Sequence, residues 1–202
     1  MGREGMVQTS DIRLMAQKYV KHGAFIEELI EHLEGTAQLA QELSVKYGLS
    51  SGMGSAAGYW HDVSRGWSSD ASRHQAIDLG LKVDAEEVTA GTSLIHGHIA
   101  ARLWQDEFGA TEQEWQHAIA CHTLGTQNPT ICDQIIGVAD FAAYNRKNQV
   151  AAQIRQLAFT DLLKAYLIVY ESKVKHLTML GKKVHPQAQN TLLALQRSAN
   201  AG

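Results

Sequence analysis

Apolar residues recur every three or four positions along much of this chain, which is the spacing of amphipathic helices. The clearest example is the range 25–47, whose apolar positions are Phe25, Leu29, Leu33, Ala40, Leu43 and Tyr47. The stretch GLSSGMGS interrupts the pattern, which resumes through AAGYWHDVSR and stops near Gly66. This spacing predicts one helix over 25–47 and another over 56–65, and the mixed range 68–84 is expected to be loop with a short helix.

Further helical patterns follow in the second half of the chain. They cover 85–108 as one or two helices, then 111–123, 131–147 and 161–180, where Gly181 ends the last one. Gly97 is a candidate for close packing, and Thr111 with Glu114 three residues later matches a capping box. Strand-like alternation is scarce, and no repeat or linker divides the chain. We therefore expect an all-α fold: one helical domain over 21–202, preceded by an N-terminal extension or first helix over 1–20.

Composition narrows the classes of function. With 45% hydrophobic and 19% charged residues among 202, the chain can bury one ordinary core. A net charge of −3 argues against a nucleic-acid partner, and two cysteines without CxxC spacing suit neither a disulfide framework nor a zinc knuckle. No apolar run reaches the length of a membrane span, and the first residues lack the apolar core of a secretory signal. Met6 also breaks a myristoylation motif. We expect a cytoplasmic protein that acts without a membrane.

Several polar residues occupy helix positions that the apolar stripes predict to be buried: His32, His122 and Asp140. His96 lies in the middle of the stretch SLIHGHIAA. The adjacent pair His61 and Asp62 closes another apolar stretch. A buried, unpaired carboxylate costs several kcal/mol, so these groups need a cation or a proton. A single histidine on an apolar face is more often a hydrogen-bonded core residue, and Asp140 could instead cap a helix or pair with Arg146. A metal cluster would satisfy all of these groups at once.

The ordered set His32, His61–Asp62, His96, His122, Asp140 resembles the HD-domain metal-dependent phosphohydrolase superfamily. Within it, the chain is most similar to the bacterial YqeK family of symmetrical dinucleoside tetraphosphate hydrolases. The stretches that carry the resemblance are EHLEGTAQLAQEL, YWHDVSR, LIHGHIAARL, AIACHTLGT, IIGVADFAAYNR and LTMLGKKVHPQAQN. They span residues 31–190, which is most of the chain.

The resemblance implies a helical bundle with a buried dinuclear site, whose ligands would be His32, His61, Asp62, His96, His122 and Asp140. Asp62 would bridge two divalent metal ions. Iron is the usual metal in this family, and manganese, zinc, cobalt or nickel accept such ligands. A water bridging two such ions loses a proton readily and becomes a hydroxide nucleophile for phosphorus. The implied reaction is symmetrical cleavage of diadenosine tetraphosphate (Ap4A) into two ADP, with Asp62 and Arg65 as catalytic residues. No serine or cysteine stands in a recognisable triad.

The same resemblance assigns substrate contacts. Its candidates for phosphate binding are Arg65, Thr123, Gly125 and Arg146. His98 lies two residues after His96 and so about 200° away around the helix, which puts it at the edge of the site or on the surface. Trp60 or Trp67 could stack on a base, although an aromatic residue near a helix end is more often part of the core.

Three positions depart from the family pattern: Leu29 stands where an arginine is usual, Gln134 where a lysine is usual, and Arg65 where a lysine is usual. These changes favour an alternative, an HD phosphohydrolase for another nucleotide or phosphoester. A catalytically weak, nucleotide-binding regulator is the other alternative. The sequence says little about the oligomeric state beyond allowing a homodimer.

Overall fold

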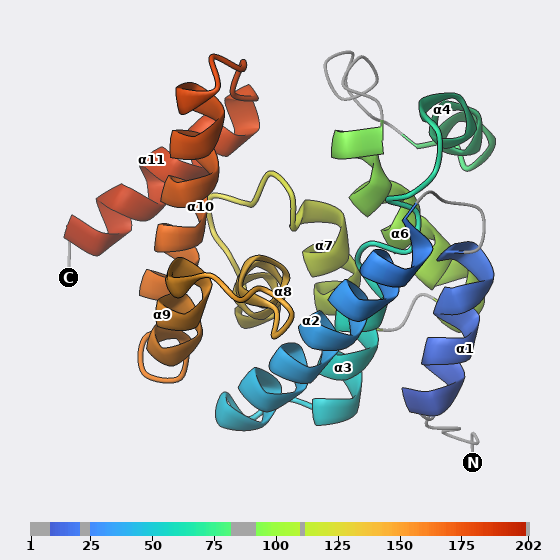
Figure 1. The fold of residues 1–202 in the computed structure, drawn as a ribbon, viewed down its shortest axis with the longest axis horizontal. Coiled ribbons are helices and arrows are strands. Elements are labelled where there is room, and N and C mark those ends of the chain that lie inside the picture. Colours follow the sequence, from blue (N-terminus) through green and yellow to red (C-terminus); the bar gives the residue numbers. More distant parts are fainter. Residues whose placement is uncertain (1–8, 21–24, 82–91, 110–111, 201–202) are drawn as a thin grey trace.

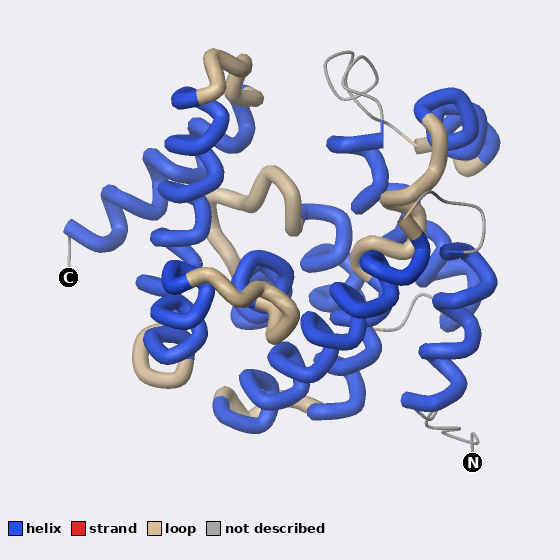
Figure 2. Tube along the Cα trace, viewed as in Figure 1, coloured by secondary structure: helices blue, strands red, loops and turns tan. Residues whose placement is uncertain are grey.

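The computed structural model describes residues 9–20, 25–81, 92–109 and 112–200, which contain helices and no strand. The helices are α1 (Thr9–Val20), α2 (Ile26–Lys46), α3 (Ser51–Trp60), α4 (Ser69–Asp78), α6 (Thr92–Phe108), α7 (Gln113–Cys121), α8 (Ile131–Ala142), α9 (Gln149–Ala158), α10 (Leu162–Met179) and α11 (Pro186–Asn200). Figure 2 shows them joined by loops. The all-α prediction is confirmed, whereas the boundary between residues 20 and 21 stays a prediction. None of the helices in the described part of the chain is long and apolar enough to cross a membrane.

Helix α8 lies at the centre of the bundle and is buried along nearly its whole length. It packs against α2 and α3 on one side, α7 on another, and α9 and α10 beyond (Figure 1). Thr130 and Asp133 form a capping box that starts the helix, because each side chain accepts a backbone N–H of the other residue. The helix ends at Ala142, five residues before the predicted end at 147, because Ala143 turns to an extended conformation.

Helix α3 begins earlier than its sequence predicts. The glycines in 48–55 predict an interruption between two helices. In the structure, Ser50 instead caps a helix that starts at Ser51 and ends at Trp60. The prediction of a helix over 56–65 is therefore wrong at both ends. A Cβ at Gly54 would lie 2.0 Å from Ser44 Oγ, and one at Gly58 would lie 2.6 Å from Ala37 Cα. The glycines thus let α3 lie directly against α2, a gain that offsets their weak helix propensity.

Four further predictions concern α4, α6, α7 and α10. Helix α4 is the short helix expected in 68–84. Gly97 is a close-packing point on α6, since a Cβ there would lie 2.9 Å from Ala120 O. Thr111 lies outside the described residues, and α7 begins at Gln113 after Glu112, which has a left-handed backbone and no side-chain cap. The helix predicted over 161–180 is α10, and it ends before Gly181.

Candidate metal centre

The six predicted ligands converge inside the bundle and are all buried. Their ligand atoms form two groups, within each of which the atoms lie no more than 4.8 Å from one another. The first group is His32, His61, Asp62 and Asp140, and the second is Asp62, His96 and His122. Helix α2 carries His32, α6 carries His96 and α8 carries Asp140, while the other three follow the ends of α3 and α7. Residues separated by more than a hundred positions therefore meet at one place.

Two of the histidines are oriented by the same local device. His61 follows the last residue of α3, and its Nδ1–H donates to the Gly58 carbonyl at 2.7 Å. His122 follows the last residue of α7, and its Nδ1–H donates to the Ile119 carbonyl at 2.8 Å. Carbonyls in the last turn of a helix lack intrahelical partners, so they are free to accept these bonds. Each bond keeps a proton on Nδ1 and turns Nε2 toward the site, the orientation that a metal ligand requires.

The carboxylate of Asp62 stands between the two groups. Its Oδ1 lies 2.8 Å from His96 Nε2 and 3.2 Å from His122 Nε2. Its Oδ2 lies 3.6 Å from His61 Nε2 and 3.7 Å from His32 Nε2. The turn that carries Asp62 is tied to α6, because Ser64 Oγ donates to the His96 carbonyl at 3.0 Å. One oxygen of Asp62 therefore faces each group of histidines.

The site contains two buried carboxylates that need positive charge beside them. Burial alone would raise the pKa of Asp62, but His61 and Arg65 beside it hold that pKa well below its usual range. Burial would likewise raise the pKa of Asp140, and Lys173 and His32 instead hold it well below its usual range. Both carboxyl groups are thus ionised in a buried place, where an anion is stable only beside cations.

The inward-facing nitrogens fit a metal site. Both ring nitrogens of His32, and Nε2 of His61, are buried and have no hydrogen-bond partner among the described residues. His96 Nε2 and His122 Nε2 lie 3.0 Å apart. Because His122 carries its proton on Nδ1, its Nε2 presents a lone pair on this side. Burial also lowers the pKa of His122 to about 4, so its ring is neutral at physiological pH. Neutral imidazoles and ionised carboxylates are the donor set of first-row divalent metals.

The predicted substrate contacts lie at different distances from these groups. Arg65 donates from a terminal nitrogen to Asp62 Oδ2 at 2.9 Å, while 52% of its side chain is exposed. Thr123 Oγ1 lies 3.2 Å from His122 Nε2 and 3.4 Å from His96 Nε2. Arg146 is exposed, and His98 is half-buried and belongs to neither group. Arg65 and Thr123 are therefore the two candidates that contact the proposed ligands.

Gly125 has a conformational role. Its φ is +75°, and a Cβ there would lie 2.7 Å from the Tyr170 ring and from Thr191 Cγ2. Its N–H donates to the Cys121 carbonyl, and its own carbonyl accepts from Gln187. The glycine lets this loop pack beneath α10 and α11, and a phosphate contact at Gly125 stays a prediction.

Trp60 belongs to the core, as an aromatic residue near a helix end more often does, and is not placed to stack on a base. It is fully buried in an aromatic cluster with Tyr19, Trp104 and Phe108, and its Nε1–H donates to the Ala100 carbonyl at 2.8 Å. Trp67 is half-buried, and its Nε1–H donates to the Tyr19 carbonyl. Trp60 thus anchors the end of α3, the helix that positions His61.

Sequence reasoning missed Lys173. Its Nζ, from α10, donates to Asp140 Oδ2 at 3.3 Å and to the His122 carbonyl at 3.0 Å. The signal that could have found it is periodic: Lys173 follows the buried Tyr170 by three residues and Tyr166 by seven, so it extends the buried face of α10. A cation on such a face needs an anionic partner.

A set of hydrogen-bonded polar side chains lies outside the two groups of candidate ligands. His117 Nε2 lies 3.4 Å from Cys121 Sγ, and His117 Nδ1 lies 2.8 Å from Oδ1 of the buried Asp133. Asp133 comes from the next helix, so local spacing along the chain does not pair it with His117 and Cys121. The hydrogen bond that His117 donates to Asp133 raises the pKa of His117 to about 10.

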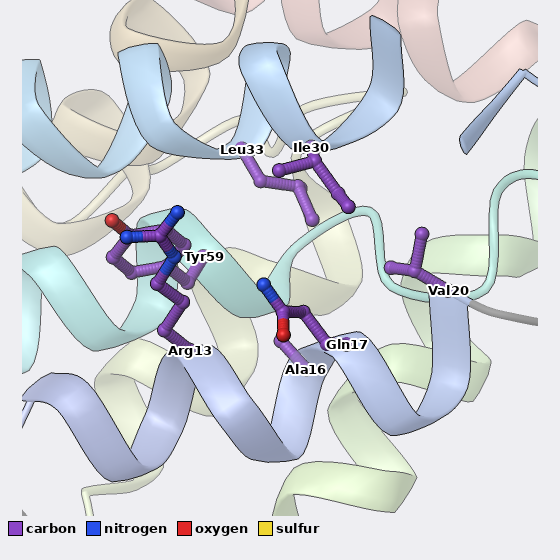
Figure 3. Close-up of a pocket in the computed structure, with 7 residues that line it drawn as sticks. All are labelled: Arg13, Ala16, Gln17, Val20, Ile30, Leu33 and Tyr59. Carbon is purple, nitrogen blue, oxygen red and sulfur yellow. The ribbon is translucent and has the colours of Figure 1, made fainter. Parts of the chain in front are cut away.

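A small pocket between α1, α2 and α3 contains none of the candidate ligands (Figure 3). Its lining is mainly apolar and consists of Arg13, Ala16, Gln17, Val20, Ile30, Leu33 and Tyr59. Nothing in its chemistry connects it with the buried histidines.

The chain is similar to known proteins in sequence and in fold. Residues 29–144 match the family described as HD domain. The chain is 28% identical over 162 residues to the symmetrical bis(5'-nucleosyl)-tetraphosphatase of Bacillus subtilis, covering 80% of this chain and 84% of that one. It is 27% identical to the same-named protein of Halalkalibacterium halodurans, covering 82% and 86%. A crystal structure of a predicted HD superfamily hydrolase involved in NAD metabolism, from Clostridium acetobutylicum, superposes with a TM-score of 0.81 at 21% identity, covering 91% and 96%.

Proposed function

Because the chain belongs to the HD domain family and is therefore a metal-dependent phosphohydrolase, we propose that it cleaves dinucleoside tetraphosphates such as Ap4A symmetrically. Water adds to one of the two central phosphorus atoms, and the bridging bond between them breaks. The products are two molecules of ADP. The relatives named as symmetrical tetraphosphatases support this substrate, and the family supports the reaction class.

The observation that carries the proposal is the placement of Asp62. Its two oxygens face two different sets of imidazole nitrogens, which suits one carboxylate shared by two cations. The first cation would be held by His32, His61, Asp62 and Asp140, and the second by Asp62, His96 and His122. Two divalent ions supply Lewis acidity and a nucleophile at neutral pH. Iron, manganese, zinc, cobalt and nickel all accept such ligands, and iron stays a prediction.

The residues of the chain then bind and orient the substrate. Arg65 uses one guanidinium nitrogen to fix Asp62, and its exposed remainder is available to a phosphoryl oxygen of the polyphosphate. Thr123 can donate its hydroxyl proton to an oxygen that approaches the second group. Arg146 and His98 stay predicted contacts at the edge.

A different nucleotide or phosphoester is the second candidate, and two residues favour it. Leu29 packs with Val20 and Leu33 in an apolar cluster, and Gln134 donates to the Pro129 carbonyl. Neither therefore supplies the positive charge that the family usually has at these positions. A substrate with fewer phosphates would need less positive charge.

The test is anaerobic reconstitution with Fe²⁺ or Mn²⁺, followed by chromatographic analysis of products from Ap4A. We expect two ADP per Ap4A, and loss of turnover in Asp62→Asn, which keeps the shape of the side chain and removes its charge. His74→Gln is the matched control, because His74 is exposed on α4 and lies outside both groups.

The product pattern separates the alternatives. ATP plus AMP would contradict symmetrical cleavage. Turnover of a nucleoside mono- or diphosphate without cleavage of Ap4A would establish the second candidate. Two bound metal ions and tight nucleotide binding without turnover of any phosphoester would establish the regulator.

A further inference from the structure

A single ammonium group touches both halves of the candidate metal centre from outside. Lys173 Nζ donates to Oδ2 of Asp140, which belongs to the first group, and to the backbone carbonyl of His122, which belongs to the second. The distances are 3.3 and 3.0 Å. Helix α10 itself contributes no residue to either group.

The contact determines which oxygen of Asp140 faces the ligands. Oδ2 is occupied by Lys173, while Oδ1 lies 3.3 Å from His32 Nε2 and 3.8 Å from His61 Nε2. A carboxylate held at one oxygen cannot rotate freely about its χ2 bond, so the other oxygen keeps a fixed direction. Hydrogen bonds of this kind orient the ligands of metal sites.

The same contact secures the turn after α7. The His122 carbonyl accepts from Lys173 and also from the buried Tyr170 hydroxyl at 2.9 Å. The ring of Tyr170 lies 5.1 Å from Lys173 Nζ, within the range of a cation–π contact. Lys173 is thus held in place by α10 and in turn holds residues from α7 and α8.

We propose that Lys173 is the positioning residue that fixes Asp140 and His122 for metal binding, a role that rests on the metal site of the proposed function.

The test measures binding of Co²⁺ alone to the apoprotein, by its visible absorption and by competition with a chelator. Lys173→Met is expected to weaken Co²⁺ binding by roughly 10- to 100-fold, the usual effect of removing such a partner, and to shift the absorption bands. Lys173→Arg is expected to recover much of the loss. Lys175→Met is the matched control, since Lys175 is exposed on the same helix, and it should bind like the wild type.

A cation near the site also repels metal ions. The direction in which Lys173→Met changes Co²⁺ affinity therefore decides whether Lys173 supports or opposes metal binding. Wild-type affinity or tighter binding in Lys173→Met would overturn the proposal. If Lys173→Met does not fold, as judged by circular dichroism, Lys173→Gln decides in the same way, because it keeps a donor and removes the charge.

The failure of this inference is distinguishable from failure of the proposed function. A wild-type protein that binds two Co²⁺ ions but does not cleave Ap4A contradicts only the substrate. A wild-type protein that binds no metal contradicts both. Two ions bound equally well by wild type and Lys173→Met contradict Lys173 alone.

Discussion

Substituting Gly58 by alanine tests whether the close contact of α3 with α2 builds the candidate metal centre. The added Cβ would lie 2.6 Å from Ala37 Cα and 2.8 Å from Ala37 N. Both are backbone atoms within α2, so no flexible side chain can move aside. Ordinary contact begins at 3.4 Å, so α3 must move by about 0.8 Å.

The magnitude follows from two opposing effects. Overpacking of this kind costs typically 1–3 kcal/mol. Replacing a helical glycine by alanine returns about 1 kcal/mol. We therefore expect Gly58→Ala to lower the free energy of unfolding by up to about 2 kcal/mol. Because His61 Nδ1 is bonded to the Gly58 carbonyl, the same movement displaces a proposed ligand, and Co²⁺ affinity should fall as well.

The same helix supplies the control. Gly52 is exposed, and its added Cβ would find nothing nearer than Ser50 Oγ at 3.9 Å. Gly52→Ala should therefore raise stability by up to about 1 kcal/mol and leave Co²⁺ binding unchanged. The assay is urea unfolding of the metal-free protein, followed by Co²⁺ titration. A Gly58→Ala protein as stable as Gly52→Ala would refute the argument from packing.

Three further predictions concern Arg65, the bound metal, and the ion pair of His117 with Asp133. Arg65→Met should raise the KM for Ap4A about tenfold, because a charge-assisted contact to phosphate is lost, and Arg65→Lys should recover part of it; an unchanged KM in steady-state kinetics would place the polyphosphate elsewhere. Removing the metal with a chelator should lower stability by at least about 2.7 kcal/mol relative to protein with metal at 100 times Kd, measured by thermal unfolding. His117→Gln should destabilise the protein by about 1 kcal/mol at pH 6, since the ion pair with Asp133 is half exposed. The Asp133 contact raises the pKa of His117 to about 10, so its contribution is complete below pH 6.5 and disappears as pH rises toward 10. Urea unfolding of both proteins at pH 6 and pH 10.5 checks this, and a pH-independent difference contradicts it.

The parts of the site that sequence could predict are those with a local signal. A polar residue on an apolar helical stripe is visible in the spacing, and so His32, His122 and Asp140 were recognised as inward-facing candidates. The structure brings these three together with His61, Asp62 and His96. Their spacing alone gave no reason for the His61 and His122 rings to be oriented by backbone carbonyls, since that depends on where α3 and α7 end.

The parts that sequence missed depend on contacts between distant segments. Lys173 lies 33 residues from Asp140 and 51 from His122, so no periodicity joins them. The start of α3 was missed for a different reason: glycine breaks an isolated helix, yet at Gly54 and Gly58 it allows two helices to touch. Only the position of α2 decides between these two effects.

The histidines at the ends of α3 and α7 give the protein a link between metal content and local unfolding. Helix ends in general open more readily than helix centres. Here the last-turn carbonyls of Gly58 and Ile119 accept hydrogen bonds from imidazoles whose other nitrogen faces the site. A cation bound by those imidazoles would therefore also brace these two helix ends, so metal binding would reduce local opening where α3 and α7 end.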